Sequence, residues 1–339
     1  MAITDFKNKP LPAYAALISV MLVAVMTVTP AANAAQSWMF GATPQVLLEQ
    51  YGDSQQRDAL LGYGILLSAD YLDKSGVKFG YNSQTVNGKA GFPDIEETTF
   101  FVSGHYLHFT DSLGGKLGLR LDGYSVDDQT KASTSSSTGM GKNQTTTTSS
   151  VSLTDKARVL YTQVDLTNFA DTMYGDIGYA LSHYDYENSD PTDSSALQDN
   201  NVSQVTATAG FALNNRYDWL QARGYFIRLD HGDNTAGVTQ TNAVELKWLH
   251  WFKPASFLHV HSSIVKLVAG KRLFAVDPDA QTAYSISDLQ TGSVAAGLDW
   301  TVGEQGTFLL LVGYDRYENQ AIADQYDARY VFSSLAFRW

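Results

Sequence analysis

Beyond about residue 35, apolar residues recur at every second position rather than at every third or fourth. Within 116–122, leucines occupy the odd positions, while Lys, Gly, Arg and Asp occupy the even ones. Residues 204–213 and 293–302 repeat this alternation. Successive side chains of a β-strand point to opposite faces, so a period of two predicts strands with one apolar and one polar face.

The alternating segments are about 11–15 residues long, whereas strands of soluble proteins are typically about 5–6 residues and a tilted membrane-spanning strand needs about 9–11. Short connections rich in Asp, Asn and Gly occur at Asp73–Gly76, Asp111–Gly115, Asn168–Asp171, Asn214–Asp218, Lys253–Ser256 and Gly303–Gly306. Longer connections alternate with them, at about 52–58, 87–97, 128–155, 187–201, 231–238, 272–283 and 319–325.

This alternation predicts an all-β fold, a transmembrane antiparallel up-and-down β-barrel of about 14 strands over residues 35–339. The six short connections are expected to be periplasmic turns and the seven longer ones extracellular loops. The first segment, Trp38 to Gln50, is interrupted by Pro44, which cannot donate a ladder hydrogen bond. A barrel of 12 strands with this segment in the lumen is therefore an alternative.

The N-terminus has the order of a secretory signal peptide. Lys7 and Lys9 precede an apolar run from Tyr14 to Val28, and Ala32-Asn33-Ala34 follows as a cleavage site. Residues 1–34 are thus predicted to be removed after export, with a retained N-terminal anchor as the alternative.

The last 14 residues, 326–339, end on an aromatic residue and carry Val331, Leu335, Phe337 and Trp339 on one face. This ending resembles the C-terminal β-signal of bacterial outer-membrane proteins, although Ser334 stands where that signal usually has Gly. The resemblance implies recognition by the barrel-insertion machinery and a location in the outer membrane, among its lipids and lipopolysaccharide. More generally, the chain resembles porin-like barrels.

The amino-acid composition excludes several kinds of catalytic and binding site. The 339 residues include no cysteine, which excludes disulfides, thiol nucleophiles and covalently attached c-type haem. A net charge of −12 argues against binding nucleic acid through its phosphates. The absence of cysteine leaves His/carboxylate metal sites open, but His259 and His261 alone are a weak metal signal. We expect no cofactor, no metal site and no nucleic-acid partner.

Polar residues opposite the apolar face are expected to line the lumen, because a charge facing lipid costs roughly 2–4 kcal/mol at the midplane. The candidates for a constriction are Arg120, Asp122, Asp165, Asp176, Arg223, Glu245, Lys247, His259, His261, Asp299 and Asp315. Arg120 and Asp122 share a strand face, as do Glu245 and Lys247 and the two histidines. Such pairs could select solutes by their field, or simply pair to stiffen the wall. The excess of acids suggests a mild preference for cations.

Two further segments could shape the passage. Residues 129–153 are Ser/Thr-rich and are expected to form an extracellular loop, with folding inward as a plug the alternative. Tyr314, Tyr317, Tyr326 and Tyr330 could form an aromatic track for sugars or belong to the interfacial girdle.

The function expected from these features is passive diffusion of small hydrophilic solutes through a polar lumen, without catalysis. One alternative is a scaffold or export barrel working with a periplasmic partner, either in polysaccharide export or as a sheath around an electron-transfer protein. The other is a hydrolase at the rim, where His183-Tyr184-Asp185 could activate water.

Overall fold

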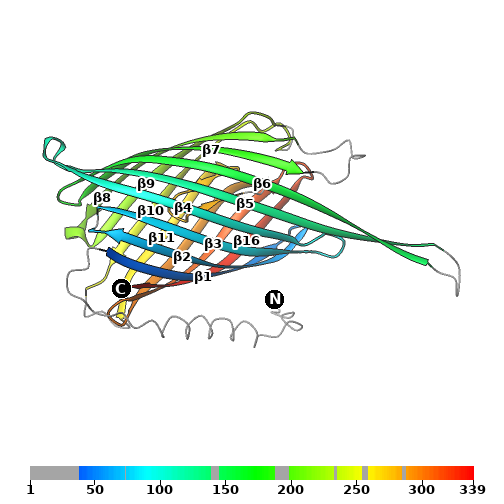
Figure 1. Ribbon diagram of the computed structural model, residues 1–339, viewed down its shortest axis with the longest axis horizontal. Coiled ribbons are helices and arrows are strands. Elements are labelled where there is room, and N and C mark those ends of the chain that lie inside the picture. The colour runs from blue at the N-terminus through cyan, green and yellow to red at the C-terminus, as the bar shows by residue number, and fades with distance from the viewer. Residues whose placement is uncertain are drawn as a thin grey trace. The chain divides into compact units, whose positions relative to one another are not determined.

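The strands of this chain form one closed antiparallel barrel (Figure 1). A computed structural model describes residues 38–72, 74–138, 145–187, 198–232, 235–253, 259–284 and 288–339, with side chains except in 131–153 and at 187. The expected signal peptide, 1–34, lies outside these residues.

The barrel strands are β1 (Trp38–Gly52), β2 (Arg57–Tyr71), β3 (Ser75–Gly88), β4 (Ile95–Thr110), β5 (Gly115–Thr138), β6 (Thr145–Asn168), β7 (Met173–Glu187), β8 (Asn200–Leu213), β9 (Asp218–Leu229), β10 (Gln240–Trp251), β11 (Val260–Arg272), β14 (Leu289–Val302), β15 (Gly306–Asn319) and β16 (Asp324–Arg338). Each pairs with its neighbours along the chain, and β1 pairs with β16. A separate two-stranded ladder, β12 (Val276–Asp277) with β13 (Thr282–Ala283), lies between β11 and β14 in the chain. Two 3-10 turns, η1 (Asp111–Leu113) and η3 (Asn214–Arg216), lie in short connections. The prediction of 14 strands is confirmed, and the 12-strand alternative is wrong.

The closing strand tolerates its proline. Pro44 lies opposite Ile65 of β2, inside the wall. On the other side, the register with β16 passes from Ala42 opposite Phe337 directly to Gln45 opposite Ser334. The gap in that ladder therefore coincides with the residue that has no N–H to donate.

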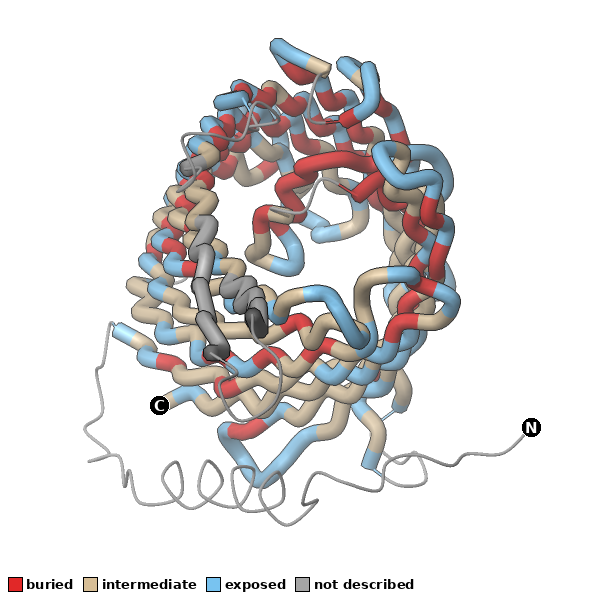
Figure 2. The backbone as a smooth tube through the Cα atoms, turned by 90° about the vertical axis from the view of Figure 1, so that its right-hand side faces the viewer, coloured by how far each residue is buried: buried red, intermediate tan, exposed pale blue. Residues whose placement is uncertain are grey.

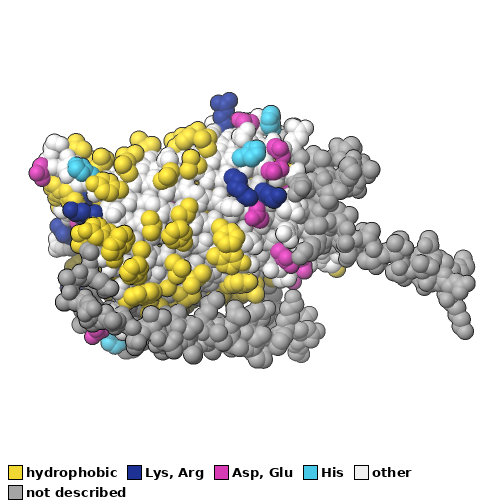
Figure 3. Space-filling view, viewed as in Figure 1, with side chains coloured by type: hydrophobic (Ala, Val, Ile, Leu, Met, Phe, Trp, Pro, Cys, Tyr) yellow, Lys and Arg dark blue, Asp and Glu magenta, His cyan; other side chains and the backbone are white. Residues whose placement is uncertain are grey.

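The outer face of the wall is apolar around its middle. Leu119 and Leu121 on β5 are 49% and 54% exposed, and Ile177 on β7 is 66% exposed. Figure 3 shows hydrophobic side chains across the visible wall, with charged residues and histidines gathered towards its ends. Because exposed apolar area of this extent is unfavourable in water, the belt suits a hydrocarbon surrounding.

The Ser/Thr-rich segment is not an unpaired loop, which corrects the expectation for 129–153. Strands β5 and β6 continue pairing as far as Thr138 opposite Thr145. Their other neighbours stop earlier, at Thr130 on the β4 side and Thr154 on the β7 side. The two strands thus extend together beyond the barrel rim, as Figure 1 shows. Residues 139–144 lie outside the described part of the chain.

No helix among the described residues is long and apolar enough to cross a membrane.

Candidate channel constriction

One connection between strands folds into the barrel instead of away from it. Residues 273–284, here called the inner loop, follow β11 and contain β12 and β13. Val276 and Asp277 have no exposed surface, and the whole run from Leu273 to Pro278 is buried. Figure 2 shows this buried segment inside the ring of strands. The sequence predicts an extracellular loop over about 272–283, but this connection is largely buried inside the barrel, which corrects that expectation.

Hydrogen bonds between wall side chains and the loop backbone hold the inner loop to the wall. The Gln204 side chain of β8 accepts from the Val276 N–H at 3.0 Å and donates to its carbonyl at 2.7 Å. The Tyr184 hydroxyl of β7 donates to the Tyr284 carbonyl at 3.1 Å. Buried backbone groups need such partners, so these side chains take the place that a neighbouring strand would have.

Apolar packing covers the same side of the inner loop. Leu273, Phe274 and Val276 belong to one buried cluster with inward side chains of β4 to β9. The Phe274 ring lies 4.5 Å from the ring of Tyr184. Phe274 also has φ 51, a conformation that bulky residues rarely adopt. The surrounding contacts must therefore stabilise this backbone conformation.

Asp277 is the buried anchor of the inner loop. Its carboxylate lies 2.8 Å from Lys266 Nζ and 3.9 Å from the Arg272 guanidinium. It also accepts from the backbone N–H groups of Asp279 and Ala280, which closes the turn between β12 and β13. Burial alone would raise the pKa of the Asp277 carboxyl, but Lys266 and Arg272 outweigh it and hold that pKa well below its usual range.

Asp279 and Pro278 reach three further strands. Asp279 lies 3.1 Å from Arg223 of β9 and also forms an ion pair with Lys247 of β10. Arg120 of β5 donates to the Pro278 carbonyl at 2.9 Å. Burial would raise the pKa of the Asp279 carboxyl, yet Lys247 and Arg223 lower it. The tip of the loop is thus held by basic residues from three wall strands.

The wall bases of this network also have acidic wall partners. Arg120 lies 2.6 Å from Asp122, and Lys266 lies 3.0 Å from Glu245. Arg223 lies 4.0 Å from Asp176. The charges are therefore largely paired, and the network holds the loop in place rather than presenting a row of free cations.

Most of the predicted lumen residues are brought together here. The residues that join the network are Arg120, Asp122, Asp176, Arg223, Glu245 and Lys247. The expected ion pair between residues two apart on one strand is present for Arg120 and Asp122. Glu245 instead pairs with Lys266, and Lys247 with Asp279. Asp165 and Asp299 lie on the inner face near the short connections. Asp315 lies on the inner face of β15 and forms no ion pair with the described residues of this network.

The two histidines do not form a pair on a strand. His259 precedes β11 with φ 55. His261 lies at a register shift between Val260 and Ser262. The expectation that both share the lumen face of one strand is wrong, because the regular ladder begins only after them.

Sequence reasoning missed Lys266, Arg272, Asp277 and Asp279. The two acids stand in a Val-Asp-Pro-Asp stretch that looks like an ordinary surface turn. One usable indication was the apolar run Leu273–Val276 just before it, since a solvated loop has little reason to carry four apolar residues in a row.

The inner wall formed by β1, β15 and β16 has a different character. Tyr51, Tyr317 and Tyr326 form a buried cluster there. The rings of Tyr317 and Tyr326 stack at 5.3 Å. The cross-strand register places Tyr330 on this inner face, opposite Glu49. Tyr314 lies one position from Asp315 on the opposite face of β15, so it cannot join the predicted aromatic track.

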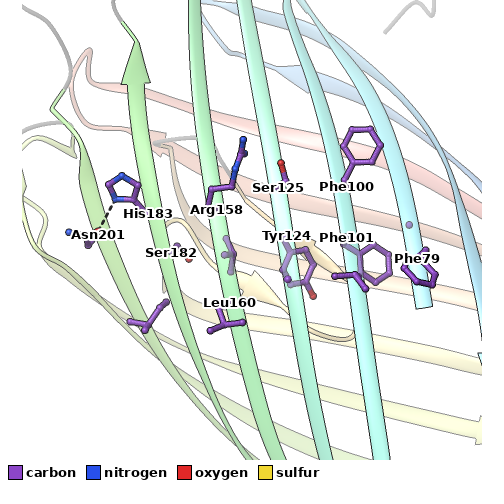
Figure 4. A pocket seen from close by; sticks show the side chains of 15 residues that line it. Phe79, Phe100, Phe101, Tyr124, Ser125, Arg158, Leu160, Ser182, His183 and Asn201 are labelled. Carbon is purple, nitrogen blue, oxygen red and sulfur yellow. Dashed lines mark hydrogen bonds between the residues drawn. The ribbon is translucent and has the colours of Figure 1, made fainter. Parts of the chain in front are cut away.

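A groove of about 810 Å³ lies on the outer face of β3 to β8, away from the inner loop. Its lining includes Phe79, Phe100 and Leu160, together with Arg158 of β6 and His183 of β7 (Figure 4). His183, the residue proposed for rim catalysis, has its Nδ1 at 2.9 Å from Asn201 Oδ1. Its partner on the neighbouring strand is Arg158, so both project outwards.

Comparison with known proteins supports the fold. No family model and no curated protein sequence matches the chain. Among solved structures, the chain is similar to the CymD monoaromatic hydrocarbon channel, with a TM-score of 0.50, 7% identity and coverage of 90% of this chain and 88% of that one. It is also similar to the Pseudomonas putida toluene transporter TodX (TM-score 0.49, 8% identity, 90% of each chain) and to a Pseudomonas aeruginosa FadL homologue (TM-score 0.46, 10% identity, 89% of each chain). At these identities the likeness concerns the fold alone.

Proposed function

We propose that this protein is an outer-membrane channel for passive diffusion of small hydrophilic solutes, with the inner loop setting the width of its passage. The closed barrel and its apolar outer belt support a place in a membrane. In bacteria, barrels of this kind belong to the outer membrane. The expected signal peptide and C-terminal β-signal agree with that location.

The observation that carries the proposal is the inner loop fixed to the wall by ion pairs. Asp277 and Asp279 bind Lys266, Arg223 and Lys247, which come from different strands. A segment held across a barrel narrows its bore at one level, and charged groups at that level favour hydrated over hydrocarbon solutes.

A planar-bilayer experiment tests this proposal. The refolded protein is expected to give steady, ohmic single-channel currents, and a variant lacking 274–283 is expected to give larger ones. Liposome swelling in small sugars should follow the same order. Absence of conductance from both proteins, when both are folded, would refute the channel and favour the scaffold alternative.

A further inference from the structure

We infer that the inner wall of β1, β15 and β16 binds organic cations, at a site made by Glu49, Asp315 and Tyr330. This inference rests on the proposed channel, because a solute reaches these residues only through the lumen. The inference names the class of solute that this channel would bind during passage.

The strand register places the three residues next to one another on the inner face. Glu49 lies opposite Tyr330, and Tyr330 lies opposite Gly313. Two positions further along, Asp315 lies opposite Ala328, which lies opposite Tyr51. The small Ala328 therefore separates the carboxylate of Asp315 from the ring of Tyr51.

Glycine at 313 lets the Tyr330 ring lie over β15. A Cβ at Gly313 would come within 2.2 Å of Tyr330 Cζ, so the ring occupies the space of the missing side chain. Tyr330 projects to the inner face and is only half-buried, so part of its ring remains accessible from the lumen. A tyrosine face attracts a cation through the quadrupole of the ring.

Asp315 has an incompletely satisfied carboxylate. The residue is 8% exposed, and its Oδ2 accepts from the Tyr317 hydroxyl at 3.1 Å. Its Oδ1 is buried and has no hydrogen-bond partner, although Ser293 lies nearby. A buried anionic oxygen without a donor is costly, and a bound cation would compensate for it.

The nearby bases are already engaged elsewhere. Lys266 binds Asp277 and Glu245, and Arg57 lies 2.7 Å from Asp288. Among the described residues, no base lies within 4 Å of the Glu49 or Asp315 carboxylate. Arg57 acts on Glu49, and Lys266 and Arg272 act on Asp315, only from beyond ion-pair distance, so neither carboxylate has a direct ion-pair partner in the described part of the chain.

The combination of acids and aromatic rings favours an organic cation over a metal ion. Small inorganic cations keep a tight hydration shell and prefer several oxygen ligands, whereas a quaternary ammonium group is weakly hydrated and binds ring faces. The neighbouring rings of Tyr51 and Tyr326 already have the Arg57 guanidinium over them, at 5.9 and 5.6 Å, so Tyr330 is the ring that this site offers to a solute. Choline, a small quaternary ammonium ion, is therefore a suitable probe.

The test measures block of the potassium current by choline in a planar bilayer. The wild-type channel should be blocked in a concentration-dependent way, and Asp315→Asn or Glu49→Gln should raise the half-blocking concentration tenfold or more. Tyr330→Leu should do the same, while Tyr330→Phe keeps the ring and should retain the block. Asp165→Asn, which removes a lumen acid elsewhere, serves as the matched control and should leave the block within about twofold.

Saturation-transfer NMR of choline with the protein in detergent separates the two proposals. Binding that is lost in Asp315→Asn, together with no conductance, would refute the channel and keep the site. Conductance with no choline block, or block and binding that are unchanged in Asp315→Asn and Tyr330→Leu, would overturn the site and keep the channel. Block by a neutral sugar that shows the same dependence on Tyr330 but none on Asp315 would also overturn it.

Discussion

The side-chain amide of Gln204 makes two hydrogen bonds with the backbone of Val276, one through its oxygen and one through its nitrogen. Gln204 lies on β8 and Val276 in the inner loop, 72 residues later in the chain. Both residues are buried, so the amide substitutes for the strand that β12 lacks on that side. This contact fixes the Val276 backbone to β8, in addition to the ion pairs that hold Asp277 and Asp279.

Replacement of Gln204 by Leu is expected to loosen the inner loop. Two neutral hydrogen bonds contribute roughly 0.5–1.5 kcal/mol each, and their loss leaves the buried Val276 N–H and carbonyl without partners. Single-channel recordings should then show frequent excursions to larger conductance. Gln221→Leu, on the inner face of β9 with its hydrogen bond to Trp219, is the control. Recordings of Gln204→Leu that match the wild type would contradict this role.

Asp277→Asn is expected to destabilise the folded barrel more than Asp279→Asn. The Asp277 side chain has no exposed surface, whereas that of Asp279 is 34% exposed. Removing one member of a buried ion pair typically costs about 3–5 kcal/mol, and solvent reduces the cost at the more exposed site. The folded and unfolded barrels can be told apart by their different migration on a gel after heating. The temperature at which the folded form disappears should be lower for Asp277→Asn than for Asp279→Asn. Equal temperatures for the two variants would argue against Asp277 as the anchor.

The docked inner loop is expected to withstand moderate acid. The pKa values of Asp277 and Asp279 are both lowered in the folded protein, so ionised carboxylates stabilise docking fully above the unfolded value of about 3.9. That stabilisation is lost only as the pH falls through the lower folded values. Conductance should therefore stay constant from pH 8 to about pH 4 and rise below it. A transition centred between pH 6 and 7 would point to a histidine instead.

Single cysteines can report the exposure of the inner loop, since the chain contains none of its own. Ala280 is exposed and Val276 has 0% exposure, although only three residues separate them. A hydrophilic thiol reagent should modify Ala280→Cys in the folded protein and reduce its conductance by more than half if the attached group is bulky. Val276→Cys should react only after denaturation. Similar rates at both positions would mean that the loop is not docked.

The strands of the barrel wall were predictable because the sequence features that specify them act between neighbouring residues. Alternation in 204–213 and tight-turn residues in Asn214–Asp218 specify strands and their reversals without knowledge of distant segments. Pro44 suggested a first strand outside the wall. The sequence does not show that the proline interrupts hydrogen bonding only on the β16 side of that strand. The Ser/Thr-rich segment was more misleading, because hydrogen bonding between β5 and β6 needs no apolar face.

The constriction was only partly predictable. Arg120, Arg223 and Lys247 could be assigned to the lumen from their strand faces, yet nothing local indicated that they meet the same loop. Tyr314 and Tyr317 look equivalent in the sequence, but strand parity places Tyr314 outside and the register brings Tyr317 against Tyr326.

By itself, the sequence determined a barrel wall with an apolar outer face, because the period of two and the turn residues act over a few neighbouring positions. Only the tertiary structure decided that residues 273–284 enter the lumen. It also decided that they pack against β4 to β9 and leave the inner face of β1, β15 and β16 open. The reason is that Asp277 finds Lys266 and Asp279 finds Arg223 and Lys247 only once the strand register has brought those bases to one level. Without that register, the same acids would belong to a solvated turn.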